Sequence, residues 1–201
     1  MVAEAGCLAG HASGHDGHFR HFVFLAAECD EPPGRPLAVE ERYPGGITRG
    51  KTGSLFSLST QSGAILGKAS EAAIGIMKDY GDNLGIAFQV VDDILDFTST
   101  AEALGKPVGS DLRQGTLTLP AMMVMEQYPG DNPVRKYFET RDEKYTVRAV
   151  DMILNSSIIE ECYRVAVEYR DRGCRGLAGV PDTASRGSLE QLGEYIINQG
   201  K

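Results

Sequence analysis

FQVVDDILDF, residues 88–97, sets three aspartates inside an apolar run. Charged side chains are rarely buried among apolar neighbours unless a partner compensates them. The preceding residues, 71–87, repeat apolar side chains at three- and four-residue steps, which predicts a long amphipathic helix. Polar residues within the run lie three or four positions apart and form one stripe on that helix. They are Gln89, Asp92, Asp93 and Asp96. Because like charges repel, this stripe predicts a divalent cation or a cationic partner.

Helical patterns follow one another after residue 50, and strand signals are nearly absent, so we predict an all-α fold. The predicted helices are Thr52–Leu66, Ser70–Phe97, Leu119–Gln127, Glu143–Leu154, Ser157–Arg172 and Ala184–Asn198. Residues 98–115 are rich in glycine and are predicted to form a loop. Ser157 with Glu160 matches a capping box, and Asp182 or Thr183 is the expected cap of the last helix.

Composition narrows the function classes. The chain has 201 residues, with 20 Lys and Arg against 28 Asp and Glu, and its formal net charge of −8 disfavours nucleic acid as the main partner. No apolar run approaches the roughly 18 residues that a membrane span needs. The four cysteines are widely spaced without a C-x-x-C pair, which predicts reduced thiols in the cytoplasm.

Two lysines accompany the aspartates. Lys106 lies in the glycine-rich loop that follows the aspartate helix, and Lys51 precedes the first predicted helix. Carboxylates that hold Mg²⁺ beside lysine side chains are a common way of binding a diphosphate. Each feature also has a simpler interpretation: the aspartates could be a solvated helix face, and the lysines could be incidental in a flexible surface loop.

Three ordered motifs together carry a resemblance to a known family. They are G-K-T-G-S-L-F at 50–56, F-Q-x-x-D-D-x-x-D at 88–96 and G-K-P-x-G-x-D-L-x-x-G-T-x-T-L-P at 105–120. From about residue 49 to residue 201 the chain resembles the C-terminal half of a trans-type isoprenyl diphosphate synthase of the polyprenyl synthetase family. The resemblance implies part of an isoprenoid-synthase-type helical bundle. Residues 1–48 lie outside the resemblance and show no sustained helical or alternating period, so we predict an irregular leader there.

The resemblance also implies a reaction and a site. An allylic prenyl diphosphate would lose diphosphate, and the resulting carbocation would be attacked by isopentenyl diphosphate. By similarity, Asp92, Asp93 and Asp96 would bind Mg²⁺ as the second of two aspartate-rich motifs. Lys51 and Lys106 would hold the allylic diphosphate, and Thr52 and Gln89 would lie along the carbocation.

The N-terminal part departs from the family. Residues 1–49 contain no D-D-x-x-D, so the first aspartate-rich motif is missing, and we expect a truncated synthase that is weakly active or inactive alone. Four histidines occur there instead, at steps that could line a helix and bind Zn²⁺ or Ni²⁺ with Cys7, although three nearby glycines disfavour such a helix. They are His11, His15, His18 and His21. A disordered leader, a fusion or an out-of-frame translation would explain this segment equally well.

The leading hypothesis is therefore a Mg²⁺-dependent prenyltransferase. The alternative from another class is a non-catalytic, synthase-like subunit that pairs with or regulates an intact synthase through its helical faces. A third is an unrelated helical module that binds diphosphate or metal. For assembly we expect either a homodimer or a heteromer with an intact synthase.

Overall fold

The structure is a computed structural model that describes residues 52–100, 102, 105 and 107–199. Every element in these ranges is helical and none is a strand, which confirms the all-α prediction. No helix within them is both long and apolar enough to cross a membrane. The leader 1–48 with its histidines, together with Lys51 and Lys106, lies outside the described residues.

A 28-residue helix, α5 (Glu71–Thr98), is the element against which most of the others pack. Ser70 caps its N-terminus, because the hydroxyl oxygen accepts a hydrogen bond of 3.3 Å from Ala73 N. The apolar positions of α5 recur every three or four residues, so one face of the helix is buried. Side chains buried along it include Tyr80, Leu84, Ala87, Val91, Ile94 and Phe97. The C-terminal half of α5, which carries the aspartates, thus lies within the packed core.

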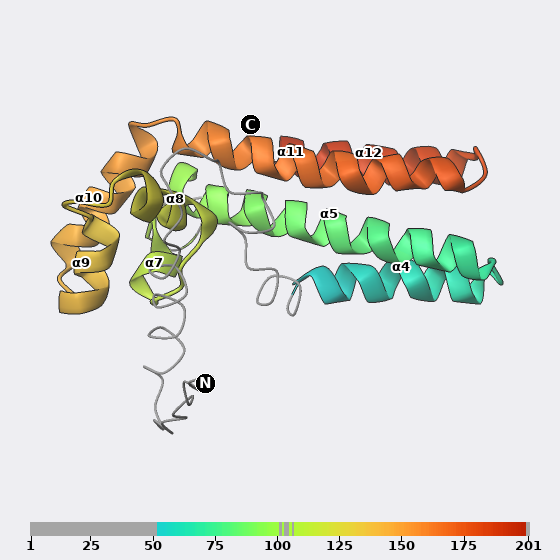
Figure 1. Ribbon diagram of the computed structural model, residues 1–201, viewed down its shortest axis with the longest axis horizontal. Coiled ribbons are helices and arrows are strands. Elements are labelled where there is room, and N and C mark those ends of the chain that lie inside the picture. The colour runs from blue at the N-terminus through green and yellow to red at the C-terminus, as the bar shows by residue number, and fades with distance from the viewer. Residues whose placement is uncertain (1–51, 101, 103–104, 106, 200–201) are drawn as a thin grey trace, which may run out of the picture. The chain divides into compact units, whose positions relative to one another are not determined.

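Three helices lie alongside α5: α4 (Ser54–Leu66), α11 (Ile158–Gly176) and α12 (Ala184–Asn198). In Figure 1, α5 runs between α4 and α11. α12 packs on both α11 and α5. The Tyr80 hydroxyl donates a 2.8 Å hydrogen bond to Leu189 O, which joins α5 to α12.

Shorter helices gather at the C-terminal end of α5 (Figure 1). They are α7 (Ser110–Arg113), α8 (Leu119–Gln127), α9 (Pro133–Thr140) and α10 (Glu143–Leu154). A 3₁₀ turn, η2 (Leu177–Gly179), follows α11. The bounds of α8, α10 and α12 agree with those predicted from the sequence. The third motif, residues 105–120, contains α7 and the start of α8.

Helices α7 and α9 were not predicted. The predicted loop 98–115 contains α7, a single turn whose four residues are too few to show a helical period. α9 has eight residues and begins with a clear local signal that the sequence prediction missed. Asn132 accepts a 3.0 Å hydrogen bond from Arg135 N, and Pro133 occupies the first turn, where its missing N–H has no consequence.

Helix ends show where local prediction succeeds and fails. Thr183 caps α12 as predicted, accepting a hydrogen bond from Arg186 N. The capping box predicted at Ser157 is wrong: its side chain makes no cap hydrogen bond and instead donates to Glu161 Oε1 at 2.7 Å. α11 also continues to Gly176, past the predicted end at Arg172.

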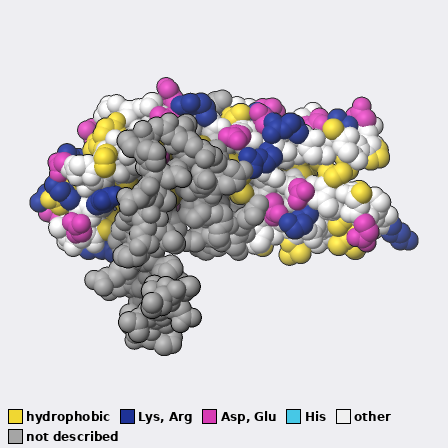
Figure 2. All heavy atoms as spheres, in the orientation of Figure 1, with side chains coloured by type: hydrophobic (Ala, Val, Ile, Leu, Met, Phe, Trp, Pro, Cys, Tyr) yellow, Lys and Arg dark blue, Asp and Glu magenta, His cyan; other side chains and the backbone are white. Residues whose placement is uncertain are grey.

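Large apolar side chains reach the surface along α4 (Figure 2). Leu55 and Leu58 are 67% and 62% exposed. On α5, by contrast, Ala87 and Val91 are 0% and 1% exposed and Leu95 is half-buried. The outer face of α4 is therefore apolar and accessible, whereas the apolar face of α5 is buried.

Candidate active site

The polar stripe of α5 divides into an exposed part and a buried part. Asp92 is exposed, whereas Asp93 and Asp96 are only 3% and 2% exposed. Gln89, one turn before Asp93, is half-buried. Buried carboxylates require hydrogen-bond donors because their desolvation is costly. The two buried aspartates receive such donors from elements far away in the sequence.

A chain of hydrogen bonds runs from the start of α4 through α5 to the start of α8. The Thr52 hydroxyl donates to Gln89 Oε1 at 2.8 Å, and Gln89 Nε2 donates to Asp93 Oδ1 at 2.9 Å. Leu119 N donates to the other oxygen, Asp93 Oδ2, at 3.3 Å. These bonds fix the orientation of the Gln89 amide, with its oxygen toward Thr52 and its nitrogen toward Asp93. Two residues assigned to the carbocation and one assigned to the metal therefore form one connected unit.

Asp96 anchors the loop that carries the third motif. Asp96 Oδ2 accepts a 3.1 Å hydrogen bond from Asp111 N, and the backbone oxygen of Asp96 accepts a 2.9 Å bond from Gly109 N. Gly109 has φ 71°, a left-handed conformation that favours glycine, and an added Cβ would lie 2.8 Å from Val150 Cγ2. The glycine-rich motif thus folds back onto the aspartate helix. These backbone donors were not predicted, although Gly109 and Asp111 both belong to the motif.

Helix α9 supports this loop from outside. The Tyr137 hydroxyl donates to Arg113 O at 2.6 Å, and Tyr137 is 6% exposed. Arg113 Nε in turn donates to Val108 O at 3.3 Å. Helix α9, which was not predicted from the sequence, therefore holds the segment next to the buried aspartates.

The carboxylate oxygens of this site are the ligand type that a hard cation prefers. Within the described ranges no three His, Cys, Asp or Glu side chains converge as a ready-made metal cage. Each oxygen of Asp93 already accepts a protein hydrogen bond, although carboxylate oxygens carry further lone pairs. Asp92 is an exposed residue on the same helix. Such a set suits Mg²⁺, which is commonly bound by one or two carboxylates, water and a phosphate ligand.

A buried cysteine lies close enough to Asp93 to be affected by its charge. Cys162 of α11 is 0% exposed, and its sulfur lies 3.6 Å from the Met123 sulfur. Burial raises the pKa of the Cys162 thiol far above its usual value, and the charge of Asp93 raises it further. Because only the thiolate is strongly nucleophilic, this thiol contributes packing and no nucleophile at neutral pH.

Comparison with known protein families gives a match over most of this region. The family model described as polyprenyl synthetase matches residues 35–155. The matched range contains all the predicted site residues. It begins within the leader and ends directly after α10.

Curated relatives and solved structures agree with that match. Solanesyl-diphosphate synthase 2, chloroplastic, from Oryza sativa subsp. japonica is 39% identical over 154 residues, which cover 74% of this chain and 37% of the relative. Heptaprenyl diphosphate synthase component 2 from Geobacillus stearothermophilus is 35% identical, with coverage of 74% and 46%.

Among solved structures, the heptaprenyl diphosphate synthase from Staphylococcus aureus superposes with a TM-score of 0.71 at 31% identity, covering 75% of this chain and 48% of that chain. The polyprenyl synthase from Caulobacter crescentus CB15, solved with calcium and isoprenyl diphosphate, has a TM-score of 0.70 at 30% identity, with coverage of 77% and 48%. The chain thus spans less than half the length of each of these relatives.

Proposed function

The chain belongs to the polyprenyl synthetase family, and from that premise we propose that it binds an allylic prenyl diphosphate for condensation with isopentenyl diphosphate. The chief support for this role is the connected unit of Thr52, Gln89 and Asp93, whose members come from two separate motifs.

In the proposed reaction the C1–O bond of the allylic diphosphate breaks, and its electron pair leaves with the diphosphate. The C3–C4 double bond of isopentenyl diphosphate then forms a bond to the allylic carbocation. Loss of a proton gives the elongated diphosphate. The demands on the protein are therefore to bind the departing diphosphate and to stabilise positive charge on carbon.

The charged residues would serve the first demand. We propose that the ammonium groups of Lys51 and Lys106 bind the diphosphate oxygens and that Asp92, Asp93 and Asp96 hold Mg²⁺, directly or through water. When bound, Mg²⁺ would supply positive charge that neutralises the leaving group. The fold of the third motif onto Asp96 supports this assignment, because Gly109 and Asp111, which follow Lys106 closely in the sequence, are hydrogen-bonded to the aspartate helix.

Thr52 and Gln89 would serve the second demand. The Thr52 hydroxyl proton is engaged by Gln89 Oε1, so the lone pairs of the Thr52 oxygen remain for a positive centre. Asp93 holds the Gln89 amide nitrogen, which keeps the amide oxygen turned toward Thr52. Oxygen dipoles fixed before the reaction stabilise developing charge without reorganisation during it.

The proposal is tested by the binding of farnesyl diphosphate, measured by calorimetry with Mg²⁺ and again with the metal chelated. We expect Mg²⁺-dependent binding that falls at least tenfold, or about 1.4 kcal/mol, in Asp92→Asn. Asp92 is exposed, so this substitution leaves the packing intact. The double variant Asp92→Ala/Asp96→Ala should abolish binding.

A matched control removes two negative charges from the other half of the same helix. Glu71 and Asp79 are both exposed, and Glu71→Ala/Asp79→Ala should bind farnesyl diphosphate as the unmodified chain does. Equal binding of farnesyl diphosphate by the control and by Asp92→Ala/Asp96→Ala would refute the proposed site. Turnover of farnesyl and isopentenyl diphosphates by the chain then separates a catalytic role from a binding role.

A second candidate function is that of a non-catalytic subunit paired with an intact prenyl synthase. The observation that favours it is the apolar face of α4, where Leu55 and Leu58 are more than half exposed. Sedimentation of the chain with and without an intact synthase tests this role. Leu55→Glu/Leu58→Glu should abolish any complex, and a complex that survives both charges would rule out this face.

The cytoplasm is our proposed compartment, and it rests on the cysteine pattern. Cys162 and Cys174 are both free thiols. Microscopy of the tagged chain in its own cells, beside organelle markers, is the measurement that decides it.

A further inference from the structure

We infer that Gly85 is a positioning residue: its missing side chain lets the start of α4 approach α5 closely enough for Thr52 to reach Gln89. This role rests on the proposed function of the Thr52–Gln89 pair. Gly85 lies one helical turn before Gln89 on α5, and Gly53 directly follows Thr52. The two glycines meet where the first and second motifs come together.

The helices α4 and α5 approach each other at two glycines of α5. A Cβ added to Gly81 would lie 2.4 Å from Thr60 Oγ1 and 2.7 Å from Ser57 Cα. A Cβ added to Gly85 would lie 2.6 Å from Gly53 Cα and 3.2 Å from Phe56 Cβ. Real Cβ atoms do not come within 3.0 Å of backbone atoms, so neither position accepts a side chain without movement.

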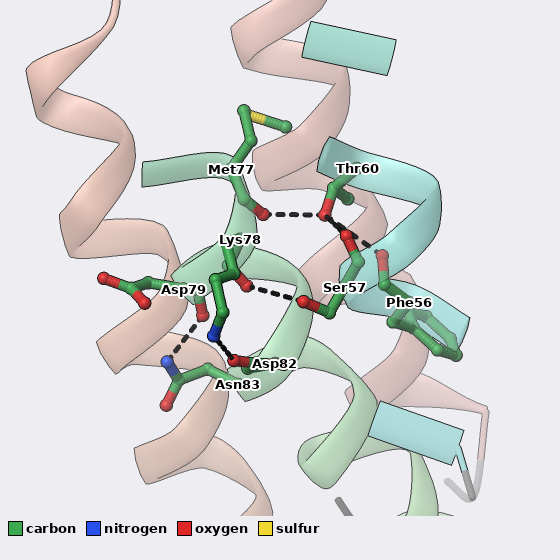
Figure 3. Close-up of polar contacts among 8 residues, drawn as sticks. All are labelled: Phe56, Ser57, Thr60, Met77, Lys78, Asp79, Asp82 and Asn83. Atoms are coloured by element: carbon green, nitrogen blue, oxygen red, sulfur yellow. Dashed lines mark hydrogen bonds and ion pairs between the residues drawn. The ribbon is translucent and has the colours of Figure 1, made fainter. Parts of the chain in front are cut away.

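Polar contacts at the same interface depend on this close approach (Figure 3). The Thr60 hydroxyl donates to Met77 O at 2.6 Å, and the Ser57 hydroxyl donates to Lys78 O at 3.5 Å. Both acceptors are backbone carbonyls of α5, which side chains of α4 can reach only when the helix axes are near. The middle of the interface is therefore fixed around Gly81, and Gly85 controls the end that carries Thr52.

The distances give the size of the effect. Restoring ordinary van der Waals contact around an alanine at position 85 requires the Gly53 backbone to move by about 0.8 Å. If Thr52 moved with it directly away from α5, the 2.8 Å contact to Gln89 would lengthen to about 3.6 Å, which is no longer a hydrogen bond. Misplacement of a reacting group by about 1 Å can lower a rate about 100-fold.

The first test measures the contact itself, in the chain without ligand. The side-chain NH₂ signals of Gln89 are assigned with Gln89→Leu and compared between variants by ¹⁵N–¹H NMR. In Gly85→Ala they should move to the positions found in Thr52→Val. Gly75→Ala is the matched control, since an added Cβ there meets nothing within 4 Å in the same helix, and it should leave the signals unchanged.

The second test measures coupling through Thr52. Gly85→Ala should slow the Mg²⁺-dependent release of diphosphate from farnesyl diphosphate at least tenfold in the unmodified chain and less than twofold in a Thr52→Val background. A general loss of packing would instead slow this release equally in both backgrounds, and that result would overturn the inference.

If Gly85→Ala folds poorly, it is made in a Gly63→Ala/Gly75→Ala background, where both added methyl groups meet open space and raise helix propensity. If the unmodified chain binds no prenyl diphosphate, the proposed function fails, and the NMR comparison still decides the positioning role. Gln89 signals that stay unchanged in Gly85→Ala would refute that role.

Discussion

Gly81→Ala should lower the free energy of unfolding, whereas Gly75→Ala, the same chemical change in the same helix, should raise it. Both glycines lie inside α5, but the atoms that surround them differ. Around Gly75 an added Cβ meets nothing within 4 Å, but at Gly81 it would lie 2.4 Å from Thr60 Oγ1 and 2.8 Å from Phe56 O.

The magnitude follows from three contributions at Gly81. Overpacking against α4 costs about 1–3 kcal/mol. Displacing Thr60 removes its 2.6 Å hydrogen bond to Met77 O, which costs about 1 kcal/mol. Replacing a helical glycine by alanine offsets these by about 0.5–1 kcal/mol. The net loss should be about 1–3 kcal/mol, against a gain of about 0.4–1 kcal/mol for Gly75→Ala.

The assay is urea unfolding followed by far-UV circular dichroism, with equal slopes in urea required for the comparison. The two variants should differ by about 1.4–4 kcal/mol in the free energy of unfolding. A Gly81→Ala variant as stable as Gly75→Ala would refute the close packing of α4 on α5. It would also remove the structural basis for the role of Gly85.

Three further predictions concern buried polar groups. Asn132→Ala should cost about 2–3 kcal/mol, because Asn132 is 1% exposed, caps α9 and donates 2.9 Å hydrogen bonds to Val124 O and Tyr128 O. Asn155→Ala is its control: Asn155 also donates to a backbone carbonyl but is exposed, so urea titration should show a change below about 0.5 kcal/mol. Burial raises the pKa of Tyr80 well above its ordinary value of 10.0, so the folded phenol stays protonated while the unfolded one ionises. Stability should therefore fall as the pH rises above about 10, and Tyr80→Phe should reduce this fall in a pH series of unfolding curves; an identical fall in both proteins would contradict the assignment. Iodoacetamide should spare Cys162, which is 0% exposed, and label the partly exposed Cys174 slowly, because burial raises the pKa of both thiols. Peptide mass spectrometry measures the labelling, and rapid labelling of Cys162 before unfolding would show that the core opens there.

The sequence predicted most of the helices because their signals are local. Apolar residues at three- and four-residue steps and a capping threonine placed α12 at Ala184–Asn198 without knowledge of any other element. α9 was missed although Asn132-Pro133 is a usual helix start, because eight residues show barely two turns of periodicity. α7 was missed because its single turn lies among glycines.

From the sequence we predicted the residues of the candidate site, but not the hydrogen bonds that join them. The spacing of Gln89 and the aspartates along one helix follows from 3.6 residues per turn. Which aspartate is buried does not, since Asp92 and Asp93 have nearly the same neighbours in the chain. The rotation of α5 relative to the start of α8 decides which aspartate is buried. Asp92 is exposed, whereas Asp93 accepts a hydrogen bond from Leu119 N.

The sequence by itself therefore determined the all-α class, most helix bounds and the residue types of the site, because these depend on interactions within a few positions along the chain. The tertiary structure alone decided which carboxylates are buried, that Thr52 meets Gln89, and that Gly81 and Gly85 differ from Gly75. Those facts depend on contacts between residues such as Thr52 and Gln89, 37 positions apart. Contacts of that kind exist only once the helices have packed.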